Sequence, residues 1–262
     1  MKDIITLLNG EEYNAPDLLS LMVDDDFYYG HLGQHALSSS ACKMLLESPK
    51  TYYYVTKYGQ KEDSPALLTG KLIHTMILEP HELENRFDIS STKGKTTKAF
   101  KELKEASKKD VVTSAEYDAA MRIVDAFNRN EIVKQYLKGS TFEQPGVGML
   151  SGLPFRAKAD IINLKEGYIA DIKTTTDLSS NFRFSARKYG YDMQAYIYTQ
   201  IFGVKDFYFI AIDKKSLDIG LFTVSEQFLF DGEQKVELAI GRFKTFFIDG
   251  QDLDTYMIVD KL

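Results

Sequence analysis

The sequence predicts an α/β fold in which a central mixed β-sheet is flanked by helices and preceded by a helical N-terminal region. Two observations predict it. Up to Gly139 the apolar residues recur about every 3.6 positions, as in helices, and after Gly139 they recur about every two, as in strands. Strand-like and helix-like segments then alternate to residue 248, which is typical of α/β domains. We expect one integrated domain, with the helical region over residues 1–138 and the sheet-containing core over residues 139–262.

The helical region contains three stretches with recognisable starts or stops. Serines suited to N-capping open the first and third, and prolines bound the second. A Ser-Pro step at Pro49 divides the first into two short helices. The predicted stretches are residues 38–58, 65–80 and 114–137. The acidic stretch up to Gln34 lacks sustained periodicity, which predicts either loose structure or docking onto the rest.

The core is divided by glycine, proline and polar turns into short strands and longer helices. The predicted strands are residues 141–143, 155–164, 168–173, 207–212 and 219–223. The predicted helices are residues 182–202 and 225–248.

Composition allows a substantial buried core and excludes several classes of protein. The 262 residues are 44% hydrophobic and include 17 Gly and 6 Pro, which excludes collagen-like and wholly disordered chains. No apolar run approaches the roughly 18 residues of a membrane span. The single cysteine, Cys42, excludes an internal disulfide, a cysteine-rich zinc site and a cysteine-ligated iron–sulfur cluster, and we expect it to be buried and inert. The sequence predicts a soluble, cytoplasmic protein with no membrane partner.

Charge is unevenly distributed along the chain. The net charge of −6 argues on average against a polyanionic partner, because binding to phosphates requires Lys and Arg. Residues 93–109, the Lys-rich segment, are nevertheless strongly basic. Two interpretations remain open for this segment: a solvated, disordered connection, or an arm that contacts a phosphate backbone without regard to sequence.

The most informative segment for chemistry is residues 155–175. Asp160 and Asp171 lie on successive predicted strands, and Lys173 shares a strand face with Asp171 because side chains two apart point the same way. If the strands pair as a hairpin, Asp160 meets Asp171. Two close carboxylates suit Mg²⁺, which prefers oxygen ligands, and a lysine beside the metal can act on water or phosphate. The alternative is a surface ion pair on an edge strand.

Three further features add candidates, each with a simpler alternative. His74 lies inside an otherwise apolar helix and is either a metal ligand or a hydrogen-bonded core residue. Glu143 lies on the strand before the hairpin and is either catalytic or a solvated strand residue. Tyr191, Gln194 and Tyr198, spaced i, i+3, i+7, share one helix face and either line a site or pack half-buried.

Taken in order, these residues resemble the phage-type exonuclease VIII (RecE-like) group of the RecB-family nucleases, within the PD-(D/E)XK superfamily. Six motifs carry the resemblance, and it covers nearly all of the chain from Ser38 onward. They are Leu37–Ser40 with Ser48 and Pro49; Gly70, His74 and Leu78–Pro80; Glu143; Lys158 and Asp160; Asp171, Ile172, Lys173 and Thr174; and Tyr191, Gln194 and Tyr198. One departure is Ala159, which replaces the motif's proline. The four-cysteine cluster of some relatives is absent from the sequence.

The resemblance implies a role for each position. It makes His74, Asp160, Asp171 and the backbone carbonyl of Ile172 the metal ligands. It makes Lys173 the catalytic lysine that positions water, Glu143 an acid that supports the metal or the water, and Gln194 a residue that steadies the lysine and the substrate phosphate. Substrate contacts would come from Tyr191, Tyr198, Lys158 and Thr174. Because imidazole suits Mn²⁺ better than Mg²⁺, we expect Mn²⁺ to substitute for Mg²⁺.

The resemblance also implies an activity. We expect a Mg²⁺-dependent exodeoxyribonuclease that degrades linear double-stranded DNA from 5′ to 3′ and leaves 3′ single strands for recombination. Its expected partners are double-stranded DNA ends, a single-strand annealing protein and further copies of itself in a ring-shaped trimer or tetramer, inside the bacterial host of a phage. Two alternatives are a structure-specific or restriction-type endonuclease on the same core, and a non-catalytic DNA-binding module.

Overall fold

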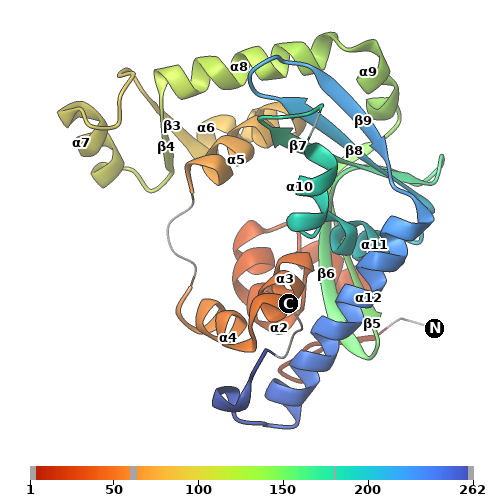
Figure 1. The fold of residues 1–262 in the computed structure, drawn as a ribbon. Helices are drawn as coiled ribbons and strands as arrows, with labels where there is room; N and C mark the ends of the chain where they lie inside the picture. The colour runs from red at the N-terminus through yellow and green to blue at the C-terminus, as the bar shows by residue number, and fades with distance from the viewer. Residues whose placement is uncertain (1–3, 60–63, 180, 259–262) are drawn as a thin grey trace.

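The computed structural model describes residues 4–59, 64–179 and 181–258, which form an α/β fold around a five-stranded mixed sheet (Figure 1). Its strand order is β5-β6-β7-β8-β9. The strands are β5 Thr141–Leu150, β6 Leu153–Asn163, β7 Tyr168–Thr175, β8 Asp206–Asp213 and β9 Ile219–Thr223. Neighbouring strands are antiparallel except for β7 and β8, which are parallel. The predicted fold class and all five strands of this sheet are confirmed.

Strand β5 is longer than the predicted residues 141–143. Pro145, Gly146 and Gly148 resemble a turn in the sequence, yet they continue the pairing with β6. The glycines are there for packing: a Cβ on Gly146 would lie 2.5 Å from the ring of Phe202. The close approach of a helix, rather than a turn, therefore explains this glycine-rich strand.

Two helices connect the parallel strands β7 and β8. They are α10 Phe182–Lys188 and α11 Tyr191–Phe202, where a single helix was predicted. Gly190, at φ 75°, separates them, because this left-handed conformation ends one helix and reorients the next. After the sheet, α12 Glu226–Phe243 packs along α11 (Figure 1).

Helices cover both faces of the sheet. On one face, α3 Ser39–Glu47, α11 and α12 enclose a core that includes Phe155, Ile169 and Phe207. On the other, α5 Pro65–Leu78 and α8 Ser114–Arg129 enclose a core that includes Ile73 and Ile172. The shorter elements are α4 Pro49–Tyr58, η2 Pro80–Glu82, α6 Leu83–Arg86, α9 Glu131–Leu137, η3 Lys244–Ile248 and η4 Leu253–Thr255. The predicted stretch 38–58 consists of α3 and α4, which meet at Ser48. The predicted stretch 114–137 consists of α8 and α9, which meet at Asn130.

The acidic N-terminal stretch is ordered and docked, so the loosely structured alternative is wrong. Its elements are β1 Ile4–Thr6, β2 Glu12–Asn14, α1 Ala15–Leu21, η1 Asp26–His31 and α2 Leu32–His35. They bury a small core of their own around Leu18, Met22 and Leu32, which packs against Val147 of β5.

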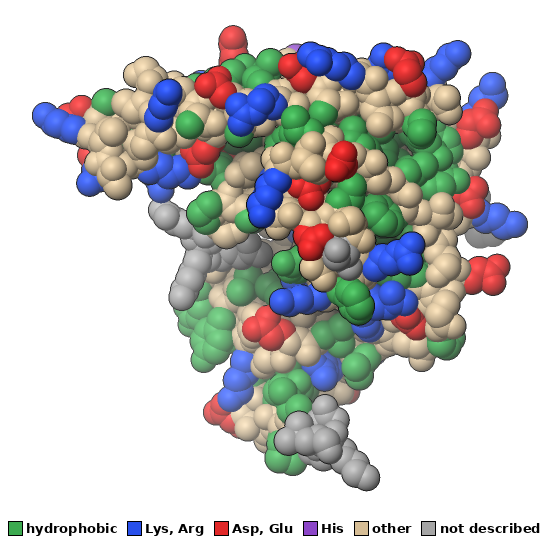
Figure 2. Space-filling model, turned by 45° about the horizontal axis from the view of Figure 1, so that its top comes forward, with side chains coloured by type: hydrophobic (Ala, Val, Ile, Leu, Met, Phe, Trp, Pro, Cys, Tyr) green, Lys and Arg blue, Asp and Glu red, His purple; other side chains and the backbone are tan. Residues whose placement is uncertain are grey.

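The Lys-rich segment is also ordered. It lies between β3 Phe87–Ser90 and β4 Asp110–Thr113, which pair in parallel, and it contains α7 Lys98–Ala106. Phe100 is buried, and Thr97 caps the helix. These elements project from the body of the molecule and carry Lys side chains on their surface (Figures 1 and 2). The prediction of a disordered connection is wrong, because an apolar anchor and a cap fix the segment.

Two smaller expectations also have outcomes. Cys42 is buried as predicted, and burial raises the pKa of its thiol to about 12, which makes it a poor nucleophile. Within the described residues, no helix combines the length and apolar character needed to cross a membrane.

The close crossing of α11 and α12 provides a stability prediction. A Cβ on Gly232 would collide with the backbone carbonyl of Asp192, which cannot move without displacing α11. We expect Gly232→Ala to lower the free energy of unfolding by about 1–3 kcal/mol, as overpacking does, measured by urea denaturation. Gly241 on the same helix has open space at its Cβ position. As the matched control, Gly241→Ala should raise stability by about 0.5–1 kcal/mol, and equal effects of the two substitutions would contradict the packing argument.

Candidate active site

Two acidic residues face each other at an interruption in the β5–β6 pairing. Phe142 pairs with Ile161 and Gln144 pairs with Ala159, while the position between them holds Glu143 and Asp160. Glu143 has φ 47°, a left-handed conformation that costs a residue with a side chain about 1–3 kcal/mol. Such strain persists only where the surrounding structure enforces it, and it is common at functional sites.

Asp160 is also fixed to the next strand. The β6–β7 pairing ends at Ile161 and Ala170. One residue further on, Asp160 Oδ2 accepts a hydrogen bond of 2.8 Å from the backbone N–H of Ile172. The carboxylate thus replaces a backbone acceptor where the strands diverge, and this fixes Asp160 beside the strand that carries Asp171.

His74 reaches the same place from α5. Its Nε2 lies 2.8 Å from the carbonyl oxygen of Ile172, and its Nδ1 lies 3.4 Å from Asp160 Oδ2. The potential ligand atoms of His74, Glu143 and Asp160 all lie within 4.8 Å of one another. A residue from the helical region therefore meets two from the sheet, and its hydrogen bond to the Ile172 carbonyl is compatible with both the ligand and the core-histidine interpretation.

Lys173 and Asp171 form a buried ion pair next to this cluster. The distance from Lys173 Nζ to Asp171 Oδ2 is 2.6 Å, and the side chains are 18% and 1% exposed, so the surface-pair alternative is wrong. Gln194 Nε2 on α11 donates a hydrogen bond of 2.5 Å to Asp171 Oδ1. Lys173 Nζ also lies 4.7 Å from the ring centre of Tyr191. Alternation along β7 brings Asp171 and Lys173 together, as the spacing predicted, and α11 brings Gln194 and Tyr191 to them, as the resemblance implied.

Two acids of the site, Asp171 and Glu143, hold their protons more tightly than free acids do. Burial, with the charge of Asp160 next in importance, raises the pKa of Asp171 to about 6. Burial, with the charges of Asp160 and Glu79, raises the pKa of Glu143 to about 8. Burial acts to lower the pKa of Lys173, but Asp171, Tyr191 and Asp160 together outweigh it and the net direction is upward.

These residues fit a divalent metal ion. The site offers carboxylate oxygens, a backbone carbonyl and an imidazole nitrogen within a small volume. Oxygen donors suit Mg²⁺ and Mn²⁺, and the imidazole favours Mn²⁺. A bound dication would also stabilise the charged forms of carboxylates that burial and mutual repulsion now disfavour.

The raised pKa of Glu143 predicts a pH-dependent stability of the metal-free protein. Between pH 4.5, its ordinary pKa, and about 8, the folded state keeps a proton that the unfolded chain releases. Stability should therefore fall as pH rises through this window. We expect Glu143→Gln, which cannot ionise, to become progressively more stable relative to the unsubstituted protein from pH 5 to 8 in urea denaturation with EDTA. A constant difference between the two proteins would show that Glu143 titrates normally.

A network of charges that sequence reasoning missed borders the cluster. Lys158 Nζ lies 2.6 Å from Asp25 Oδ1, and Arg86 Nη2 lies 3.1 Å from Asp25 Oδ2. Arg86 also pairs with Glu79. The charges of Lys158 and Arg86 act to lower the pKa of Glu143, so both cations stand near the acids. Asp25 is 133 residues from Lys158 in sequence, and no local pattern signals such a contact.

The remaining predicted substrate-binding residues differ in position. Tyr198 is 9% exposed and packs against Phe202 and Phe207 on α11 and β8. Burial raises its pKa well above the usual range. Thr174 is half-buried and alternates with Lys173, which places it toward the opposite face of the sheet. Lys158 lies 4.9 Å from the ring centre of Tyr28. The structure thus brings Tyr191 directly to the lysine, but not Thr174.

A known structure shares this architecture. A crystal structure from Eubacterium rectale, described as a "putative exonuclease", matches 91% of this chain and 95% of its own at 19% identity, with a TM-score of 0.67. This likeness shows the fold. A phage-related exonuclease from Haemophilus somnus 129PT matches 82% of this chain and 96% of its own at 12% identity, with a TM-score of 0.36.

Sequence comparison identifies the family. No curated protein matches the chain. A family model described as "PDDEXK-like domain of unknown function", DUF3799, matches residues 38–249 and so includes the His74, Glu143, Asp160 and Asp171 positions. The chain belongs to this family of PDDEXK-like domains, as its motifs and its sheet predicted.

Proposed function

We propose that this protein is a metal-dependent exodeoxyribonuclease that degrades linear double-stranded DNA from 5′ to 3′ and leaves 3′ single strands for recombination. The observation that carries the proposal is the meeting of His74 on α5 with Glu143 on β5 and Asp160 on β6, next to the Asp171–Lys173 pair on β7. Membership of the PDDEXK-like family supports a nuclease. Polarity and the preference for ends rest on the resemblance to RecE-like exonucleases.

His74, Asp160, Asp171 and the Ile172 carbonyl would hold Mg²⁺ or Mn²⁺, with Glu143 beside them. When bound, the metal supplies a Lewis acid for the scissile phosphate and lowers the pKa of water. Lys173 Nζ can donate a hydrogen bond to the attacking water or to a phosphate oxygen. Asp171 keeps Lys173 charged, and Gln194 fixes the Asp171 carboxylate from the other side.

The proposed partners follow from the same resemblance. They are double-stranded DNA ends, a single-strand annealing protein of the bacterial host or phage, and further copies of this chain in a ring-shaped trimer or tetramer. Light scattering at working concentration tests the ring, and a monomer would contradict it.

Digestion of end-labelled linear duplex tests the function itself. We expect release of nucleotides with Mg²⁺ or Mn²⁺, no release with EDTA, and a block by phosphorothioate linkages at the 5′ end. Covalently closed plasmid should remain intact, because it has no ends. Cutting of the closed plasmid would instead identify an endonuclease, and no cleavage of any DNA with either metal would overturn the proposal.

A further inference from the structure

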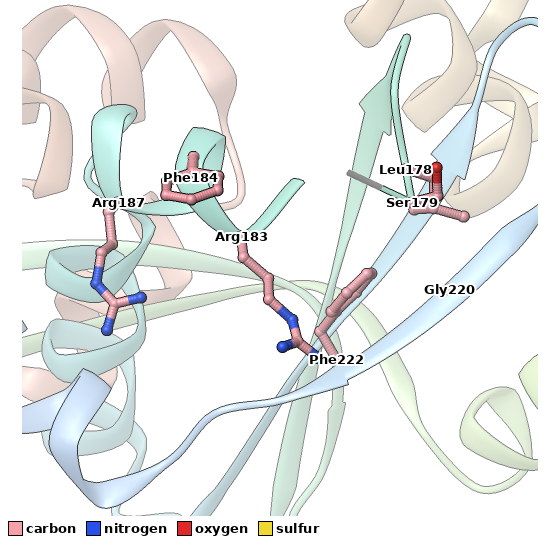
Figure 3. A pocket seen from close by; sticks show the side chains of 7 residues that line it. All are labelled: Leu178, Ser179, Arg183, Phe184, Arg187, Gly220 and Phe222. Carbon is pink, nitrogen blue, oxygen red and sulfur yellow. The ribbon is translucent and has the colours of Figure 1, made fainter. Parts of the chain in front are cut away.

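A pocket is lined in part by the segment that follows β7, the strand that carries Asp171 and Lys173. It is an open cavity of about 900 Å³ between α10, the segment after β7, and β9. Its lining combines two arginines of α10 with apolar side chains of the surrounding elements (Figure 3). The residues that matter below are Arg183, Phe184, Arg187, Gly220 and Phe222.

Contiguous aromatic rings join this pocket to the active-site lysine. Lys173 Nζ lies 4.7 Å from the ring centre of Tyr191. The ring centres of Tyr191 and Phe182 are 6.3 Å apart, and those of Phe182 and Phe222 are 4.4 Å apart. Phe222 lines the pocket and Phe182 is buried, so a continuous packed layer of rings connects the surroundings of Lys173 with the pocket wall.

The two arginines of the pocket differ in their partners. Arg187 Nη2 lies 3.6 Å from Asp231 Oδ2, and its guanidinium lies over the ring of Phe228. Arg183 has no acidic partner within the described part of the chain, and Figure 3 shows its side chain extending toward Phe222. A phosphate entering the pocket therefore meets one cation that is already paired and one that is available.

The apolar part of the pocket suits a base. Phe184, one residue after Arg183, is 74% exposed, although burial of such a ring is favourable. The absence of a side chain at Gly220 lets Phe222 and Leu178 pack close to the strand backbone. A Cβ there would lie 2.7 Å from the Phe222 ring and 3.2 Å from Leu178. An exposed ring and an available cation in the lining of one pocket provide what an unpaired nucleotide needs, because bases stack on aromatic side chains and their phosphates pair with arginine.

We propose that this pocket holds one nucleotide of an unpaired DNA strand next to the cleavage site. Arg183 binds its phosphate and Phe184 stacks on its base. The inference rests on the proposed function, since the nucleotide in the pocket would belong to the single strand that is present during cleavage. Duplex DNA cannot occupy the pocket in this way, because its bases are stacked on one another.

The test compares binding and cleavage in the full chain. Fluorescence anisotropy with a labelled oligothymidylate, in EDTA at low salt, measures single-strand binding without hydrolysis. We expect Arg183→Ala to weaken binding about tenfold and to reduce the dependence of log K on log salt by about 0.7, the value for one phosphate contact on a single strand. Phe184→Ala should weaken binding at least about fivefold, as loss of base stacking does. Arg129→Ala, an exposed arginine on α8, is the matched control and should bind normally.

The outcomes separate this inference from the proposed function. Normal binding by both pocket variants, or no binding by the unsubstituted protein up to about 100 µM, overturns the pocket whether or not the protein cleaves DNA. Weakened single-strand binding in a protein that never cleaves DNA would leave the pocket standing and overturn the nuclease. Equal weakening for a hairpin-capped duplex of the same length would show that Arg183 contacts phosphates in general, which also overturns the pocket. Both variants should melt within a few degrees of the unsubstituted protein, because both side chains are exposed.

Discussion

Lys173→Ala is expected to lower the rate of DNA hydrolysis by at least about a thousandfold. Lys173 is the one cation that the described structure pairs directly with Asp171, at 2.6 Å, and its pKa is raised, so it carries its charge at neutral pH. A positioned charge at the reacting phosphate typically contributes about 10²–10³ to the rate. Alanine also leaves the buried Asp171 without its counter-charge. The measurement is release of acid-soluble nucleotides from linear duplex with Mn²⁺.

The control must separate lost chemistry from lost folding. Lys235 forms a comparable pair with a buried acid, since its Nζ lies 2.5 Å from Asp192 Oδ2 and Asp192 is fully buried. Lys235→Ala should therefore lose stability to a similar extent, measured by urea denaturation, and keep its activity below its melting temperature. If Lys173→Ala kept more than about a tenth of the activity, a change of only ~1.4 kcal/mol in the barrier, the lysine would not have the role proposed for it.

Local patterns account for the part of the site that lies on neighbouring strands. Asp171 and Lys173 meet because strand side chains alternate, and Asp160 joins them because β6 and β7 form a hairpin. Both follow from spacing within a short stretch of sequence. Spacing alone placed Gln194 only on a shared face of α11, and its position at β7 was implied by the resemblance.

Local sequence patterns could not predict the long-range contacts or the strained backbone of the site. His74 lies 98 residues from Ile172, and only an ordered set of motifs indicated that α5 would pack at this point. No sequence motif includes Asp25. It contacts Lys158 and Arg86 because the N-terminal elements fold against β5. The left-handed Glu143 was also unpredictable, since its strain is imposed by surrounding packing rather than by its own residue type.

The paired strands β3 and β4 illustrate the same limit for the fold. Each has four residues, and the pairing joins segments on either side of the Lys-rich segment. A polar, lysine-rich composition suggested disorder, whereas the single buried ring of Phe100 and the hydrogen bond of Ser107 to Asp88 hold the segment in place. The average composition of a segment does not reveal single contacts of this kind, so it does not predict that the segment is ordered.

Asp160→Asn is expected to weaken binding of Mn²⁺ by at least about a hundredfold and to bring hydrolysis below detection. Asparagine can still accept the hydrogen bond from the Ile172 N–H, so the local backbone should be kept. It removes the charge that a dication needs and offers one neutral oxygen in place of a carboxylate. Calorimetric titration of the metal-free protein with Mn²⁺ measures the affinity without DNA. The surface variant Asp218→Asn should bind as the unsubstituted protein does.

The stability of the same variant supports or refutes the explanation. The charge of Asp160 contributes to raising the pKa of both Asp171 and Glu143, so in the metal-free protein these acids repel one another. Removing that charge should raise the melting temperature at pH 7 in EDTA while it abolishes metal binding. A variant that lost the metal through misfolding would instead melt at a lower temperature. Mn²⁺ affinity within threefold of the unsubstituted protein would mean that the ion is held without Asp160, and the ligand set proposed around His74 would be wrong.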